Sequence, residues 1–264
     1  MHHIFLFDLD QTLLDFHASE KKGLQIVVEA EGFRFSDDLY SYFKARNKEL
    51  WLELEKGTIS RTELFETRFR LLFEKCGADT MTMDLLRIND DFIRAMARNG
   101  VPMDGSLAFL KKLRDTIPDA KIYIVTNGVQ MNAEGRIRST GMDALIDGLF
   151  VSTTIGANKP SVEYFDIVLK MIGEEIGGAE AKYIVIGDSL TSDMRGAKDA
   201  GLPSCWFVPE ESGACGTLTK GVEQMAGDAK PEEITRAMAQ YVIDYIATSF
   251  DEMYEILREW ADAD

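Results

Sequence analysis

Short apolar runs rich in β-branched and aromatic residues alternate with helical patterns along most of the 264-residue chain, and this alternation restricts the fold more than any other feature. The runs expected to form strands are Ile4–Phe7, Lys121–Val125, Leu149–Ser152, Tyr183–Ile186 and Cys205–Val208, with a weaker one at Tyr241–Ile243. The patterns expected to form helices are Ser106–Thr116, Val129–Ser139, Val162–Ile172 and Ser192–Ala200. Strands and helices in alternation are typical of parallel βαβ units with apolar strands covered on both faces. The sequence therefore predicts an α/β fold with a doubly wound, mainly parallel, Rossmann-like sheet, which binds ligands outside the carboxyl ends of its strands.

The stretch from about residue 16 to residue 100 contains helical patterns but no convincing strand. The patterns cover His17–Glu31, Asp37–Lys56, Arg61–Cys76 and Met83–Asn99. The third carries an apolar stripe of helical period, formed by Leu64, Phe65, Phe69, Leu72 and Phe73. We therefore expect residues 1–15 and 101–264 to form the Rossmann-like core domain and residues 16–100 to form an all-helical cap domain over the end of the first strand. A helical extension packed elsewhere, with no role at the site, is the alternative.

The C-terminal part contains one helix signal and one unexplained segment. Ser249 and Glu252 have the spacing of a capping box, which predicts a helix from there to about Trp260. Residues 210–240 are rich in Gly, Glu and Lys and carry no chemical motif, so we interpret them as a surface insertion.

Composition excludes several classes of partner. The formal net charge of −16 repels nucleic acid polymers and anionic membranes, so neither is expected to bind. No apolar run approaches the ~20 residues that a membrane-spanning helix needs, and the N-terminus does not resemble a secretory signal. The cysteines, at positions 76, 205 and 215, lack CxxC spacing. A cytoplasmic protein, monomeric or weakly dimeric, is the expectation.

Four groups of polar residues follow four of the expected strands. Asp8 and Asp10 come directly after the first strand, and two carboxylates so close together repel unless a divalent cation offsets their charge. One of them could attack phosphorus while the other moves a proton on the leaving oxygen. Thr126 ends the second strand, and its hydroxyl and the backbone N–H groups after it suit a phosphate.

The other two groups add a cation and two more acids. Lys159 precedes Pro160, which suits the first turn of a helix, so a cation is expected at a helix N-terminus near the same sheet edge. Asp188 and Asp193, on the loop that enters the last helix of the series, can supply a metal ligand and a partner for a lysine. A helix N-cap at Ser192 or Asp193 is the structural alternative. Because all four groups lie at carboxyl ends of strands, we expect them to form one site.

The four groups together resemble the signature of the haloacid dehalogenase superfamily of aspartyl-nucleophile phosphotransferases. The matching residues are Asp8, Asp10 and Thr12, then Thr126, then Lys159 and Pro160, then Gly187, Asp188 and Asp193. A helical cap between the first two motifs is the arrangement of subfamily I. The resemblance covers about residues 3–208 and the C-terminal strand and helix.

The resemblance implies a magnesium-dependent phosphatase. Asp8 would attack the phosphate and form an aspartyl-phosphate, and Asp10 would protonate the leaving alkoxide and then deprotonate the attacking water. Mg²⁺ would be held by the Asp8 carboxylate, the Asp10 backbone carbonyl and Asp188.

The remaining motif residues would act on the transferring group. Thr126 and the Asn127 N–H would bind phosphate oxygens, and Lys159 would balance charge on the nucleophile and the phosphoryl group. Asp193 would orient Lys159 or a metal-bound water. Such a site works by positioning and electrostatics.

A finer resemblance points to the pyrimidine 5′-nucleotidase branch, whose members hydrolyse nucleoside 5′-monophosphates. It is carried by the segments Asn47–Trp51, Glu55–Ile59, Arg68–Phe69, Thr126–Gly128 and Arg138–Gly141. The segment at about 210–240 departs from that branch. In the cap, Lys48 and Trp51 are candidates for contact with the substrate.

Three other functions are alternatives to this phosphatase. A metal-free dehalogenase is disfavoured because the dehalogenases of this superfamily lack the acid that Asp10 supplies. A phosphosugar phosphatase or mutase shares all four motifs and stays open. A non-catalytic module with a phosphorylatable aspartate needs neither Asp10 nor a cap.

Overall fold

The computed structural model describes residues 1–55, 58–209 and 243–263. The strands are β1 (His2–Phe7), β2 (Ala120–Thr126), β3 (Gly148–Val151), β4 (Ala181–Gly187), β5 (Ser204–Phe207) and β6 (Tyr245–Ala247). The longer helices are α1 (Phe16–Ala30), α2 (Asp37–Glu55), α3 (Arg61–Lys75), α4 (Leu85–Arg98), α5 (Ser106–Thr116), α6 (Gln130–Thr140), α8 (Val162–Glu175) and α12 (Phe250–Asp262). The shorter ones are α7 (Ser152–Ile155), α9 (Arg195–Asp199), the 3₁₀ turns η1 (Thr80–Thr82) and η2 (Met142–Leu145), and the π-helical turn η3 (Leu190–Met194).

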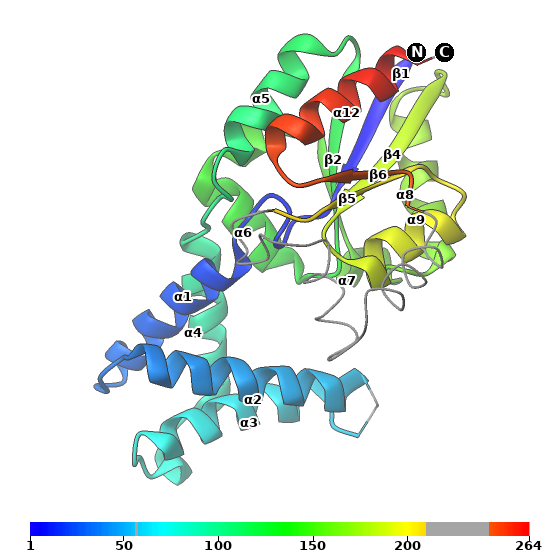
Figure 1. Cartoon of the computed structure of the whole chain (residues 1–264). Coiled ribbons are helices and arrows are strands. Elements are labelled where there is room, and N and C mark those ends of the chain that lie inside the picture. Colours follow the sequence, from blue (N-terminus) through cyan, green and yellow to red (C-terminus); the bar gives the residue numbers. More distant parts are fainter. Residues whose placement is uncertain (56–57, 210–242, 264) are drawn as a thin grey trace, which may run out of the picture. The chain divides into compact units, whose positions relative to one another are not determined.

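The strands form one parallel sheet in the order β3-β2-β1-β4-β5-β6 (Figure 1), which confirms the predicted doubly wound α/β fold. β1 lies between β2 and β4, and Phe7 is in register with Ile124 on one side and Ile186 on the other. Because these three strands end together, the residues that follow each of them meet at one sheet edge. This register brings the polar groups after β1, β2 and β4 to the same place.

Alternation along the strands divides the core into two layers. Phe5 and Phe7 point to a cluster that includes apolar residues of α5, α6 and α12, whereas Ile4 and Leu6 point to a cluster with α8 and α9. All four side chains are fully buried. A run that is apolar on both faces is what a parallel strand covered by helices on each side requires.

Two secondary-structure predictions near the sheet's edge and in its last crossover were wrong. The weak strand expected at Tyr241–Ile243 is found at β6 instead; Ile243 lies outside any strand, and residues 241–242 lie outside the described part of the chain. The helix expected from Ser192 begins earlier, as η3, because the Ser189 hydroxyl accepts from the Ser192 N–H and caps this turn. The alternative that Ser192 or Asp193 provides the N-cap is therefore wrong.

Two predicted helix starts also differ in detail. Helix α8 begins at Val162 with Ser161 as its N-cap, so Pro160 lies before the helix and not in its first turn, and its peptide bond with Lys159 is cis. Ser249 caps α12 as predicted. The Glu252 carboxylate, however, accepts from the N–H and the hydroxyl of Thr248. The segment at 210–240 lies outside the described residues.

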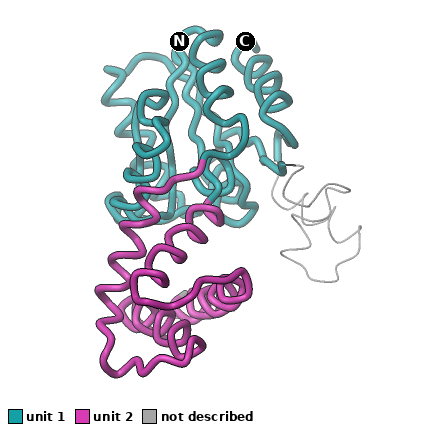
Figure 2. Tube along the Cα trace, turned by 90° about the vertical axis from the view of Figure 1, so that its left-hand side faces the viewer, with its two compact units in different colours: residues 1–15, 102–264 teal, residues 16–101 magenta. Residues whose placement is uncertain are grey.

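The chain divides into two compact units (Figure 2), one formed by Met1–Asp15 with Pro102–Asp264 and the other by Phe16–Val101. We call the first the core unit and the second the helical unit. The helical unit contains α1 to α4, and its apolar centre includes Val28, Phe43, Phe69, Phe73 and Phe92. Its residues that the structure describes form helices, turns and loops, as the sequence predicted.

A layer of buried polar side chains crosses the helical unit. The Arg68 guanidinium, 5% exposed, donates to the Asn89 and Asn47 side-chain oxygens, and the Asn47 amide donates to Glu20 at 3.3 Å. Burial lowers the pKa of Arg68 to about 10, which leaves it charged at neutral pH.

The two predicted substrate contacts of the helical unit differ in exposure. Lys48 is exposed and Trp51 is half-buried on α2. Among the described helices, none combines the length and apolarity of a membrane span.

Candidate active site

A tight turn after β1 aims the first pair of aspartates. The Asp8 N–H donates to the Ile186 carbonyl at 2.8 Å, which fixes the start of the turn against β4. Gln11 adopts a positive φ of 63°, and its N–H bonds to the Leu14 carbonyl at 2.8 Å. The Thr12 hydroxyl, fully buried, donates to Asp8 Oδ2 at 3.4 Å. The backbone thus holds the Asp8 side chain at the carboxyl end of the central strand.

Lys159 is the cation beside Asp8. Its Nζ donates to Asp8 Oδ1 at 2.7 Å, to Asp193 Oδ1 at 2.6 Å and to the Val125 carbonyl at 2.8 Å, so all three ammonium hydrogens have acceptors. Burial opposes the charged form, but Asp193 and Asp8 outweigh it and raise the pKa of Lys159. The lysine therefore neutralises the predicted nucleophile. A phosphate oxygen would have to share or replace one of these three acceptors.

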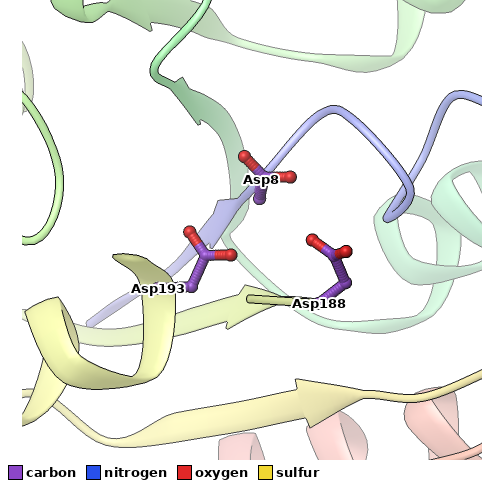
Figure 3. Close-up of side chains that lie close together, drawn as sticks. All are labelled: Asp8, Asp188 and Asp193. Atoms are coloured by element: carbon purple, nitrogen blue, oxygen red, sulfur yellow. The ribbon is translucent and has the colours of Figure 1, made fainter. Parts of the chain in front are cut away.

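Asp8, Asp188 and Asp193 form an acidic cluster in which one carboxylate oxygen of each lies within 4.8 Å of the others (Figure 3). Burial raises the pKa of Asp8 to about 7, with Lys159 acting in the opposite direction. Burial and the neighbouring carboxylates also raise the pKa of Asp188 well above its ordinary value. Carboxylate oxygens at this spacing are suitable ligands for a hard divalent cation, which would offset the repulsion.

Neighbouring groups fix the two acids contributed by the loop after β4. Asp193, fully buried, accepts from the Ser189 N–H through Oδ2 at 3.1 Å while its other oxygen holds Lys159. The Trp206 indole donates to the Asp188 backbone carbonyl at 2.8 Å. Asp193 is thus fully engaged by protein groups, whereas the Asp188 carboxylate faces the cluster. Asp193 thus bonds to Lys159, and the assignment of Asp188 as a metal ligand stays a prediction.

Asp10 is not one of the three carboxylates of the acidic cluster, and it is held by Arg136, a residue that was not among the predicted site residues. The Arg136 guanidinium, on α6, donates to both oxygens of the Asp10 carboxylate, from Nη1 to Oδ1 and from Nη2 to Oδ2 at 3.1 Å. A signal was present, because Ala133, Arg136 and Ile137 have the spacing of one buried helix face. An arginine on such a face needs a buried anionic partner.

Thr126 and Asn127 lie on the turn after β2. The Thr126 hydroxyl, 2% exposed, accepts from the Gly128 N–H at 3.2 Å, which leaves its own hydrogen for an acceptor such as a phosphate oxygen. The Asn127 side chain donates to the Lys159 carbonyl at 2.9 Å and accepts from the Lys159 N–H at 2.8 Å. This amide pairing joins the turn that carries Thr126 to the turn that carries the lysine.

The ionised groups of the site carry a net negative charge that a divalent cation would balance. Four carboxylates (Asp8, Asp10, Asp188 and Asp193) are grouped with two buried cations, Lys159 and Arg136. With all groups ionised, two negative charges remain uncompensated. The fold and site thus define a doubly wound α/β protein with an acidic, lysine-containing centre at the carboxyl ends of its strands.

Comparison with known families identifies this class. The family model of the haloacid dehalogenase-like hydrolases matches residues 2–201. The chain therefore belongs to the haloacid dehalogenase-like hydrolases, as its motifs predicted.

Two kinds of relatives are 30–33% identical to the chain over the aligned residues. HAD-hydrolase YfnB of Bacillus subtilis is 33% identical over 206 residues, which cover 78% of this chain and 83% of that protein. Pyrimidine 5′-nucleotidase PynA of Streptococcus pneumoniae is 33% identical over 77% of this chain and 83% of that protein. Pyrimidine 5′-nucleotidase YjjG of Escherichia coli is 30% identical over 76% of this chain and 84% of that protein.

Solved structures agree with this family. The crystal structure of B. subtilis YfnB bound to magnesium matches with a TM-score of 0.73 and 29% identity, over 97% of this chain and 98% of that one. The defluorinating L-2-haloacid dehalogenase Rha0230 matches with a TM-score of 0.66 over 97% of this chain and 95% of that one, at 15% identity. The second match supports the fold alone.

Proposed function

We propose that this hydrolase is a Mg²⁺-dependent phosphatase of small phosphate monoesters and that nucleoside 5′-monophosphates are its substrates. The observation that carries the proposal is the environment of Asp8. Asp8 directly follows the central strand β1. Its carboxylate accepts from Lys159 at 2.7 Å and has an oxygen within 4.8 Å of an oxygen of Asp188. An ionised carboxylate held between a lysine and a cation-binding acid is arranged to attack an anionic phosphoryl group.

The residues present fit a magnesium ion. Asp8 and Asp188 would hold Mg²⁺ with their carboxylates and Asp10 with its backbone carbonyl, all hard oxygen donors. When bound, the ion would neutralise negative charge on the phosphate and stabilise the charge that develops as the phosphoryl group transfers. The relative YfnB, whose structure contains magnesium, supports this choice of metal.

The protein residues would carry out the reaction in two steps. Asp8 attacks the phosphorus in line, the bond to the leaving oxygen breaks, and Asp10 gives that oxygen its proton. Asp10 then takes a proton from water, whose oxygen attacks the phosphorus, and the Asp8–phosphate bond breaks to release inorganic phosphate. Thr126 and the Asn127 N–H hold phosphate oxygens, while Lys159, positioned by Asp193, neutralises Asp8 and the transferring group.

The relatives support a nucleotide substrate. PynA and YjjG are pyrimidine 5′-nucleotidases, and each is at least 30% identical to this chain over more than three quarters of its length. We further propose that the helical unit is a cap that selects the substrate. The chain leaves the core unit after Asp15 and rejoins it at Pro102, and Leu14 bridges to Pro102 only six residues after Asp8.

A phosphate-release assay tests the proposal. The protein, with Mg²⁺ or with EDTA, is incubated with a panel of nucleoside 5′-monophosphates and sugar phosphates beside Asp8→Asn. Asp199→Asn, an exposed acid on α9 outside the site, is the matched control. Release that needs Mg²⁺ and Asp8 but not Asp199 supports the mechanism. Release unaffected by EDTA or by Asp8→Asn contradicts it, and formation of an isomer without free phosphate would identify a mutase.

A further inference from the structure

Arg136 makes the most specific charged contact in the site to which neither the motifs nor the reaction assigns a role. Its guanidinium spans both oxygens of Asp10, and the side chain is only 2% exposed, against 29% for the Asp10 side chain. A planar guanidinium that bonds two carboxylate oxygens fixes the orientation of the carboxyl plane as well as its distance. Arg136 therefore restricts Asp10 in a way that a single hydrogen bond could not.

The location of Arg136 ties together two loops of the site. The helix that carries it, α6, follows the turn of Thr126 and Asn127, whereas Asp10 lies on the turn after β1. The residues are 126 positions apart in the sequence. A contact at that separation cannot arise from a local turn preference, so it depends on the packing of α6 against the core.

The two aspartates of the turn after β1 form ion pairs with different cations. Lys159 bonds to Asp8, and Arg136 bonds to Asp10. Because Asp8 is placed to attack phosphorus, its partner has to leave one oxygen accessible. Asp10 moves a proton at the leaving oxygen, so its side chain has to be held in one orientation and kept away from the acidic cluster. A bidentate arginine holds a carboxyl group in one orientation, whereas the ammonium group of a lysine does not.

We propose that Arg136 is a positioning residue for Asp10, which fixes the carboxyl group of the proton donor at the leaving-group side of the site. This inference rests on the proposed phosphatase function. It predicts that loss of Arg136 slows the steps in which Asp10 transfers a proton and leaves attack by Asp8 intact. A structural role in α6 would instead reduce every activity together.

The test compares two esters that differ in their need for a proton. The value of kcat/KM includes only the steps up to departure of the leaving group, which for a nucleoside 5′-monophosphate is an alkoxide that needs a proton. For p-nitrophenyl phosphate the leaving group is a phenolate, which is stable without a proton. For Arg136→Gln we expect kcat/KM to fall roughly 10–100-fold with the nucleotide, because general acid catalysis typically contributes 10²–10⁴-fold. With p-nitrophenyl phosphate we expect a change of less than about threefold.

Three variants complete the test. Arg138→Gln removes an exposed arginine two residues away and should match wild type with both esters. Arg136→Lys should recover part of the loss, with kcat affected more than KM. The double variant Asp10→Asn/Arg136→Gln should be no slower with the nucleotide than Asp10→Asn alone, because residues that act as a unit are not additive. Melting temperatures identify any variant that fails to fold.

The outcomes separate this inference from the proposed function. Wild type that releases no phosphate from either ester contradicts the function itself. Active wild type with an Arg136→Gln variant that loses equal activity with both esters, or none with either, overturns the positioning role alone. Additive losses in the double variant would also overturn it.

Discussion

Gly187 ends β4 and has no room for a side chain, which makes Gly187→Ala a sharp test of the site's packing. A Cβ added at this residue would overlap the Asp193 carboxylate and lie 2.8 Å from the Asp193 Cβ. Because carbon atoms in contact lie ~3.5–4.0 Å apart, one of the two segments has to move by about 1 Å. Asp193 cannot move that far and keep its bonds of 2.6 Å to Lys159 and 3.1 Å to the Ser189 N–H.

The size of the effect follows from those two bonds. Each hydrogen bond to a charged group contributes about 1.5–3 kcal/mol, and overpacking a close-packed interior costs about 1–3 kcal/mol more. Partial relaxation makes about 3 kcal/mol a reasonable expectation for the loss of unfolding free energy. For a chain of this size that corresponds to a fall of roughly 6–12 °C in melting temperature. Since Lys159 loses its anchor, we also expect kcat to fall at least about tenfold with little change in KM.

The assay is thermal melting followed by circular dichroism, together with steady-state kinetics. Gly173→Ala on α8 is the matched control, because an added Cβ there would meet no atom within 4 Å, and alanine favours the helix by about 0.5–1 kcal/mol. Combining Gly187→Ala with Asp193→Ala should cost much less than the sum of the two single changes, because both act on the same side chain. A Gly187→Ala variant with wild-type melting temperature and activity would refute the reasoning.

Three further predictions concern the metal and the lysine. Because the pKa of Asp8 is raised to about 7, the metal-free native state keeps a proton that the unfolded chain loses near pH 4. Melts in EDTA should therefore show the free energy of unfolding falling as pH rises from about 4 to 7. Asp8 alone contributes up to about 1.4 kcal/mol per pH unit, and Asp188, whose pKa is also raised, adds to the fall. Stabilisation by Mg²⁺ should be larger at pH 8 than at pH 5; an equal Mg²⁺ effect at both would contradict this. Trp206→Phe removes the indole bond to the backbone carbonyl of Asp188, the proposed metal ligand, and should weaken Mg²⁺ binding in calorimetric titration about tenfold, whereas Trp260→Phe, on α12, should not. Asn127→Ala keeps the backbone N–H but removes both bonds to the Lys159 main chain, so kcat should fall in steady-state assays while KM stays near wild type; a change confined to KM would argue against this role.

The sheet was predictable from the sequence because each strand is a short apolar run that ends at a polar turn. The position of β6 was not, since both Tyr241–Ile243 and Tyr245–Ala247 have suitable residues. A tertiary contact determines which of the two segments forms the strand. The N–H and hydroxyl of Ser204 donate to the Asp244 carboxylate at 2.9 and 3.3 Å, which anchors the chain next to β5 and places Tyr245 opposite Cys205. Nothing local to residues 241–247 encodes that partner.

The start of the helix after β4 was mispredicted for a related reason. Ser192 and Asp193 both look like N-caps, but the N–H groups of Asp193 and Met194 both donate to the Ser189 carbonyl. The hydrogen bonds thus begin one turn earlier, and the widened turn presents Asp193 to Lys159. The helix start follows from Ser189, whose hydroxyl caps the turn and whose carbonyl accepts both of these N–H groups.

The site's acidic residues were visible in the sequence, but the assignment of a cation to each was not. Spacing alone groups Asp8 with Asp10, and it offers Lys159 as one cation near both. The structure distinguishes them, because Arg136 on α6 bonds to Asp10 whereas Lys159, on the loop before α8, bonds to Asp8. The motifs predict which side chains lie at the sheet edge. The proposed roles of nucleophile and proton donor differ because each carboxylate bonds to a different buried cation. In the proposed mechanism that difference depends on Arg136, which lies outside every motif and is identifiable only as a charged residue on the buried face of α6.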